Sequence, residues 1–119
     1  MTLPIDEGLG ILRKTLDELG IAKDTFILFF SDNGGTPEGP SSSPSLRGLK
    51  GTVYEGGHRV PAIACWPGHI PANTVSAQPL ISIDVMPTLL SLAGVKDSGI
   101  RKLDGIDFSP VFLEQKALP

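Results

Sequence analysis

The strongest constraint on the fold is the stretch Thr25–Phe30, in which five bulky apolar side chains follow one another without a polar interruption. A strand with one solvated face alternates apolar and polar residues, whereas a strand covered on both faces does not. Asp24 precedes the stretch, and the turn-forming residues Ser31–Gly35 follow it. The pattern therefore predicts a strand near residues 25–31, buried on both faces of a parallel sheet.

The remaining elements are predicted from shorter patterns. Apolar residues spaced by three and four positions indicate an amphipathic helix over residues 5–19, and Gly20 is the expected end of that helix. Further patterns predict a strand near 61–66, a helix near 84–93 capped by Asp84 and closed by Gly94, and a last helix near 109–115. A long loop rich in Gly, Pro and Ser separates the two strands. This order of elements is typical of an α/β domain.

Size, charge and hydropathy exclude several classes of protein. The chain has 119 residues, which is enough for one domain and too few for two. Its net charge of -3, without a cluster of basic residues, argues against a nucleic-acid partner. No apolar run approaches the roughly 18 residues that a membrane span needs. We therefore expect neither a nucleic acid nor a membrane among its partners.

Asp32 and Asn33 are the first candidate site residues, because they follow the predicted buried strand at its carboxyl end. Ligands of open α/β sheets bind at that end of the strands. Carboxylate and carboxamide oxygens suit a hard cation such as Ca²⁺ or Mg²⁺. The alternative is that Asp-Asn-Gly-Gly only forms a turn after the strand.

A composite motif begins at Leu46 and ends at Pro61, with the order Leu-Arg-Gly-Leu-Lys-Gly-Thr-Val-Tyr-Glu-Gly-Gly-His-Arg-Val-Pro, and Trp-Pro-Gly follows at 66–68. Together with the Ser-Asp-Asn-Gly strand end, it closely resembles a signature stretch of type I sulfatases, the family of arylsulfatases and N-acetylgalactosamine-6-sulfatases. The Leu-Asp-Glu-Leu-Gly, Ile-Asp-Val-Met-Pro-Thr-Leu-Leu and Leu-Asp-Gly-Ile stretches resemble the family as well. The resemblance covers residues 5–113.

The resemblance implies a fragment of an alkaline-phosphatase-like fold, with a mostly parallel sheet flanked by helices. Residues 1–119 would be the C-terminal portion of a sulfatase catalytic domain. Asp32 and Asn33 match metal ligands of the family, which holds Ca²⁺, with Mg²⁺ as an alternative. Lys50 matches a lysine that contacts the sulfate group, where a cation and an ammonium would together neutralise charge on the sulfate oxygens. Without the motif, Lys50 would be interpreted as an ordinary lysine in solvent.

Two further charged residues and a histidine lie in the same motif. Glu55 and Arg59 are four positions apart, so they could form an ion pair that holds the loop of Lys50. His58 is a possible acid or base, but it stands at a position that is apolar or variable in the family pattern. We therefore do not assign a catalytic role to it.

Cys65 is the only cysteine of the chain, so no internal disulfide can form. Cys-Trp-Pro-Gly-His at 65–69 imitates the Cys-x-Pro-x-Arg motif that the family oxidises to formylglycine, but His replaces Arg and the place in the family order is wrong. We predict a buried strand thiol. The nucleophile-bearing N-terminal portion is then absent from these residues, and the fragment alone should bind metal weakly and be inactive.

Three alternatives stay open from the sequence. The first is a phosphodiesterase or phosphatase of the same superfamily. The second is a short, non-catalytic interaction module, and the third is a parent protein that has lost catalysis. A Cys-x-Pro-x-Arg motif upstream in the reading frame would separate them from a sulfatase.

The resemblance also implies partners and a compartment. The substrate would be a sulfated small molecule or a sulfated glycan, and the compartment would be periplasmic, extracellular or lysosomal. A half-domain should expose an apolar surface, so we expect self-association through a sheet face or edge.

Overall fold

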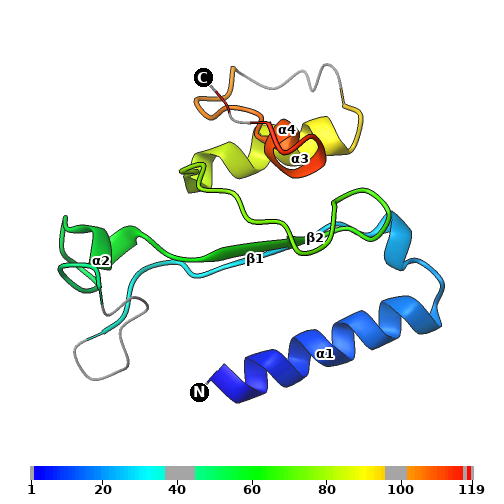
Figure 1. The fold of residues 1–119 in the computed structure, drawn as a ribbon, viewed down its shortest axis with the longest axis horizontal. Helices are drawn as coiled ribbons and strands as arrows, with labels where there is room; N and C mark the ends of the chain where they lie inside the picture. The colour runs from blue at the N-terminus through cyan, green and yellow to red at the C-terminus, as the bar shows by residue number, and fades with distance from the viewer. Residues whose placement is uncertain (1, 37–44, 96–101, 117, 119) are drawn as a thin grey trace. The chain divides into compact units, whose positions relative to one another are not determined.

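The computed structural model describes residues 2–36, 45–95, 102–116 and 118. The chain forms two compact units, Met1–Trp66 and Pro67–Pro119, each with its own internal contacts. The first unit contains α1 (Thr2–Glu18), the 3₁₀ turn η1 (Ala22–Asp24), β1 (Ile27–Phe30), α2 (Glu55–His58) and β2 (Ala62–Cys65) (Figure 1). The second contains the 3₁₀ turn η2 (Ser82–Asp84), α3 (Val85–Leu92) and α4 (Ser109–Leu113).

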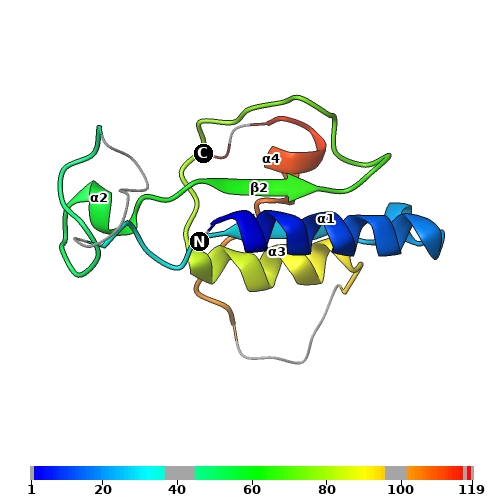
Figure 2. The ribbon, with the colours of Figure 1, turned by 90° about the horizontal axis from the view of Figure 1, so that it is seen from below.

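The predicted N-terminal helix is confirmed as α1, which begins three residues earlier than expected and is unbroken in both views (Figures 1 and 2). It ends at Glu18, one residue earlier than expected, and Gly20 follows its end as predicted, where two hydrogen bonds of 3.0 Å close the last turn. In these bonds, Gly20 N–H donates to the Asp17 carbonyl and Ile21 N–H to the Leu16 carbonyl. Most of the apolar stripe on α1 is exposed, with Ile5 at 51% and Leu12 at 44%. The helix thus carries the predicted amphipathic pattern without a covering layer in the described residues.

The two predicted strands are present as β1 and β2, but they pair antiparallel, with Ile27 opposite Cys65 and Phe30 opposite Ala62. The parallel sheet is therefore not confirmed. Burial of β1 on both faces was also wrong, because Phe29 and Phe30 are 38% and 41% exposed. Among the described residues, β2 alone pairs with β1 and no buried apolar layer covers these rings, so the apolar run stays partly exposed.

The end of the sheet that carries Ile27 and Cys65 is tied to η1 by an indole ring. Trp66 Nε1 donates a hydrogen bond of 2.7 Å to the carbonyl oxygen of Lys23, 43 residues earlier in the chain. The same ring meets Phe26 edge to face, with the ring centroids 6.0 Å apart. These contacts help to fix the register in which β2 returns along β1.

The second unit holds the buried core of the described residues. Phe108 and Val111 are its buried apolar side chains, and Thr88 of α3 is 1% exposed. The Thr88 hydroxyl donates to the Asp84 carbonyl oxygen at 2.7 Å and accepts the Phe108 N–H at 2.9 Å. One buried hydroxyl thus joins the start of α3 to the residue that precedes α4.

Asp84 precedes α3 as predicted, but its side chain does not cap that helix. Its backbone is already helical (φ -75°, ψ -16°) because the residue ends η2. The carboxylate instead accepts the N–H of Ile81 at 3.1 Å and the N–H of Ile106 at 3.0 Å. The predicted end of the helix at Gly94 is confirmed, since Gly94 N–H donates to the Ser91 carbonyl at 2.9 Å. The last helix, α4, ends at Leu113, two residues earlier than expected.

None of the helices in the described part of the chain combines the length and the apolar character needed to cross a membrane.

Candidate functional site

The predicted metal ligands lie directly after β1. Asp32 is exposed and Asn33 is half-buried. The Asn33 side chain donates from Nδ2 to the Gly34 carbonyl oxygen at 2.9 Å, and the Ser31 hydroxyl donates to the Asn33 carbonyl oxygen at 2.9 Å. The first of these bonds engages the amide nitrogen of Asn33, so Oδ1 is the atom of this side chain that can ligate a cation.

The loop that carries Lys50 returns to this strand end. The backbone N–H of Lys50 donates a hydrogen bond of 2.8 Å to the carbonyl oxygen of Gly35, two residues beyond Asn33. The backbone N–H of Gly34 donates to the Gly57 carbonyl oxygen at 3.0 Å. Both bonds join the strand end to the motif loop. The position of the Lys50 ammonium relative to the Asp32 carboxylate stays a prediction.

Lys50 occupies the second position of a β-turn over Leu49–Thr52. The Thr52 N–H donates to the Leu49 carbonyl oxygen at 3.0 Å, and Gly51 at the third position has φ +85°. A positive φ at the third position is characteristic of a type II turn and favours glycine there. This β-turn gives a structural reason for the order Lys-Gly-Thr in the motif.

The glycines of the motif allow three backbone segments to meet. A Cβ atom at Gly34 would overlap the carbonyl oxygen of Gly56, and a Cβ atom at Gly56 would overlap that of Gly48. Gly34, Gly56 and Gly57 are buried, and the Gly56 N–H donates to the Arg47 carbonyl oxygen at 2.7 Å. Any side chain at Gly34 or Gly56 would push the motif loop away from the strand end.

An interaction that the sequence analysis missed links Arg47 to Tyr54. The guanidinium carbon of Arg47 lies 3.8 Å from the centre of the Tyr54 ring, which is a cation–π geometry. The sequence did not predict this contact, because an Arg and a Tyr seven residues apart in a Gly-rich loop form no periodic pattern. The pair closes the part of the loop that contains Lys50.

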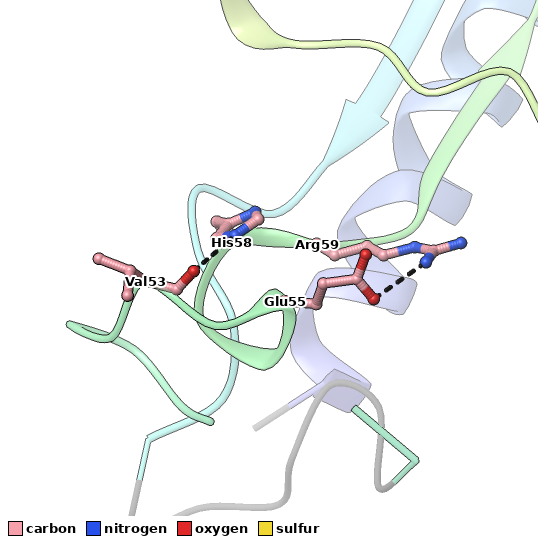
Figure 3. A network of polar contacts seen from close by, with 4 residues as sticks. All are labelled: Val53, Glu55, His58 and Arg59. Carbon is pink, nitrogen blue, oxygen red and sulfur yellow. Dashed lines mark hydrogen bonds and ion pairs between the residues drawn. The ribbon is translucent and has the colours of Figure 1, made fainter. Parts of the chain in front are cut away.

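The predicted ion pair between Glu55 and Arg59 is confirmed at 3.1 Å (Figure 3). Their side chains are 57% and 64% exposed, so the pair spans α2 at the surface. The ring of His58 points instead toward Val53, with Nε2 3.3 Å from the Val53 carbonyl oxygen. His58 is thus engaged with the backbone of its own loop.

Cys65 lies in β2 opposite Ile27, as expected for a strand thiol, but it is half-buried rather than buried. Among the described residues, β2 pairs with β1 alone, so its other edge has no neighbouring strand. The Cys65 thiol is therefore partly accessible.

The described residues do not bring together three His, Cys, Asp or Glu side chains that could hold a metal ion. Asp32 and Asn33 supply two hard oxygen ligands, and Ca²⁺ usually takes about 6–8. These two residues fit part of a Ca²⁺ or Mg²⁺ site, and further ligands would be needed to complete it.

Comparison with known proteins gives consistent results. A family model described as Sulfatase matches residues 2–95. N-acetylgalactosamine-6-sulfatase from Rattus norvegicus is 47% identical over 115 residues, which cover 92% of this chain and 22% of that protein. Arylsulfatase A from Homo sapiens is 41% identical over 116 residues, which cover 93% and 22%. The crystal structure of Ps i-CgsB in complex with k-i-k-neocarrahexaose matches with a TM-score of 0.85 at 35% identity, over 95% of this chain and 25% of that one. The chain thus spans about a quarter or less of the length of these relatives.

Proposed function

The chain belongs to the sulfatase family, and from this premise we propose that it works as part of an enzyme that hydrolyses sulfate esters. Family membership supports the class of reaction. The hydrogen bond between Lys50 N–H and the Gly35 carbonyl oxygen supports the location of the site, because it holds the motif loop against the strand end that carries Asp32 and Asn33.

In this proposal, Lys50 contacts the sulfate group of the substrate. Hydrolysis adds water across the ester S–O bond and releases an alcohol and sulfate, while negative charge shifts toward the leaving oxygen. A positive charge at the sulfate group, close to the leaving oxygen, lowers the energy of that transition state most when it is already in position. The β-turn and the bond to Gly35 fix the backbone from which the Lys50 side chain extends.

Asp32 and Asn33 would provide two ligands of a Ca²⁺ ion, with Mg²⁺ as the alternative. Such an ion would polarise a sulfate oxygen as a Lewis acid. The Asp32 carboxylate would supply negative charge to the site, and Asn33 would contribute Oδ1 while its Nδ2 stays bonded to the Gly34 carbonyl oxygen. We propose that the other ligands and the formylglycine nucleophile come from parts of the sulfatase domain outside these 119 residues. The 119 residues alone would then be inactive.

The same proposal extends to the fold and the substrate. The β1–β2 pair would belong to a larger, mostly parallel sheet of the alkaline-phosphatase-like type, whose further strands would cover Phe29 and Phe30. The substrate would be a sulfated glycan or a small aryl sulfate. The structural relative bound to k-i-k-neocarrahexaose favours the glycan. We place the enzyme in a periplasmic, extracellular or lysosomal compartment, which fractionation of the source cells would test.

The experiment that tests the function is a Lys50→Ala substitution in the full-length protein that carries this segment. We expect turnover of an aryl sulfate to fall by roughly 10²–10³-fold, the usual cost of one lost electrostatic contact in a transition state. Lys23→Ala is the matched control, because Lys23 is exposed and its hydrogen bond to Trp66 uses only the backbone carbonyl. An unchanged rate in Lys50→Ala would refute the role of this lysine.

The substrate class is tested with the same preparation. A sulfatase should hydrolyse the aryl sulfate and a sulfated oligosaccharide much faster than the matching phosphate monoester or diester. Preference for a phosphate ester would instead support the phosphatase or phosphodiesterase alternative. Binding of partners with no hydrolysis of any ester would support the interaction module.

A further inference from the structure

We propose that Thr52 is a positioning residue for Lys50, and that its hydroxyl closes the turn from which the lysine side chain extends. The inference rests on the proposed contact between Lys50 and sulfate. Thr52 does not touch the substrate in this proposal. It acts through the backbone of Leu49–Thr52.

Three hydrogen bonds join Thr52 to Leu49, the residue just before the lysine. The Thr52 hydroxyl donates to the Leu49 carbonyl oxygen at 2.7 Å and accepts the Leu49 N–H at 3.2 Å. The backbone N–H of Thr52 donates to the same carbonyl oxygen at 3.0 Å. A common β-turn has only the last of these bonds. The hydroxyl therefore adds two hydrogen bonds to the turn. They restrict a backbone that Gly51 would otherwise make more flexible.

The Thr52 side chain also lies where the segments of the motif loop cross. A Cβ atom added to Gly48 would lie 2.5 Å from Thr52 Oγ1, and one added to Gly57 would lie 3.0 Å from the same oxygen. The Gly57 carbonyl oxygen accepts the Gly34 N–H at the end of β1. The hydroxyl thus sits between the turn of Lys50 and the backbone that ties this turn to the strand end.

Lys50 is consequently fixed from two sides, by the Thr52 hydroxyl through Leu49 and by its own N–H bond to Gly35. A lysine side chain loses considerable rotamer freedom when it is held in one contact. Because the backbone of Lys50 is already fixed, contact with the substrate restricts only the lysine side chain. Small displacements of a group that binds the substrate strongly reduce the reaction rate. Loss of the hydroxyl should therefore weaken the action of Lys50 without removing its charge.

The test compares Thr52→Val with Thr52→Ser in the full-length protein that carries this segment. Valine keeps the shape of threonine without the hydroxyl, and serine keeps the hydroxyl without the methyl group. We expect kcat/KM for an aryl sulfate to fall roughly 10–100-fold in Thr52→Val. Thr52→Ser should stay much closer to the native rate, and hydrogen exchange of the Lys50 amide should be faster only in the valine variant. Val53→Ala serves as a control, since the Val53 side chain is 91% exposed in the same loop.

A double-mutant cycle with Lys50→Ala separates positioning from a general structural role. If Thr52 acts through Lys50, Thr52→Val causes no further loss once the lysine is gone. An equal loss in both backgrounds, or no loss in Thr52→Val while Lys50→Ala is impaired, overturns the inference. If Lys50→Ala itself leaves the rate unchanged, the proposed role of Lys50 fails first and the inference fails with it. Should circular dichroism show that Thr52→Val is unfolded, Thr52→Ala takes its place in the cycle.

Discussion

Oδ1 of Asp84 accepts a hydrogen bond of 3.0 Å from the backbone N–H of Ile106, which lies 22 residues further along the chain. Oδ2 of the same carboxylate accepts the N–H of Ile81 at 3.1 Å, and Asp84 is only 7% exposed. A single buried carboxylate therefore holds the Asp104–Gly105 bend against the start of α3. A Cβ atom at Gly105 would overlap the carbonyl oxygen of Ile83, so this contact also depends on a glycine.

The first prediction is that Asp84→Ala lowers the free energy of unfolding of the second unit by about 3–6 kcal/mol. The substitution leaves two part-buried backbone N–H groups without their charged acceptor, and each such hydrogen bond contributes about 1.5–3 kcal/mol. Thermal or urea unfolding followed by circular dichroism measures the change. Asp104→Ala is the control, because this exposed carboxylate lies in the same bend. Equal effects of the two substitutions would contradict the role of Asp84.

Local signals in the sequence were sufficient for most helices and strands. The spacing of leucines predicts α1, and Gly20 and Gly94 end helices where expected because each takes a positive φ with the hydrogen bonds of a helix end. The direction in which β2 pairs with β1 could not be predicted in this way. An uninterrupted apolar run indicates burial between layers, but it carries no information on the neighbouring strand.

The candidate site was predictable only through the family resemblance. Asp32 and Asn33 alone would be interpreted as a turn, and Lys50 alone as a surface lysine. The return of the loop depends on backbone contacts at Gly34 and Gly56, which have no side chain to leave a periodic pattern. The stacking of Arg47 on Tyr54 and the buried role of Asp84 depend on tertiary contacts, so propensity rules do not reveal them.

The second prediction concerns the acid sensitivity of the second unit. Burial alone would raise the pKa of the Asp107 carboxyl, but hydrogen bonds from Ser91 and Ser109 outweigh burial and hold the pKa below its ordinary value. The Ser109 N–H donates to Asp107 Oδ1 at 2.8 Å. A carboxyl with a depressed pKa stabilises the fold above the unfolded pKa of about 3.9, and this contribution is lost as pH falls through the lower, folded value.

Asp107→Asn tests this assignment. We expect the wild type to have the higher melting temperature at pH 7, and the difference from Asp107→Asn to shrink below about pH 4 as the native carboxyl becomes protonated. Melting temperatures measured at intervals from pH 7 to pH 3 follow the difference. A difference in melting temperature that does not change with pH would show that the carboxylate charge is not the stabilising feature.

The third prediction is that the 119-residue chain self-associates when it is prepared alone. Phe29 and Ile63 stand opposite each other in the sheet and are 38% and 64% exposed, so they share one apolar face. Sedimentation velocity should show species larger than a monomer that increase with concentration. Ile63→Lys should shift the distribution toward monomer, because a charge on this face opposes burial.

Val75→Lys is the matched control for this experiment. Val75 is fully exposed outside the helices and strands, so a lysine there adds the same charge without altering the sheet face. The control should sediment like the wild type. A wild-type chain that stays monomeric at all concentrations would contradict the prediction, as would an equal shift in both variants.

The last prediction is that Arg47 and Tyr54 stabilise the motif loop jointly. A guanidinium 3.8 Å from the ring centre should contribute about 0.5–1 kcal/mol at an exposed site, and Tyr54 is 42% exposed. A double-mutant cycle with Arg47→Met and Tyr54→Leu, followed by urea unfolding, should give a coupling free energy in that range. A parallel cycle with Glu55→Gln and Arg59→Met provides the comparison, since exposed ion pairs four residues apart on a helix are worth about 0.3–0.5 kcal/mol and weaken with salt. The Arg47–Tyr54 coupling should change less with salt than the Glu55–Arg59 coupling, because the ring carries no net charge. Additive single substitutions, with no coupling between Arg47 and Tyr54, would show that the stacking does not hold the loop of Lys50.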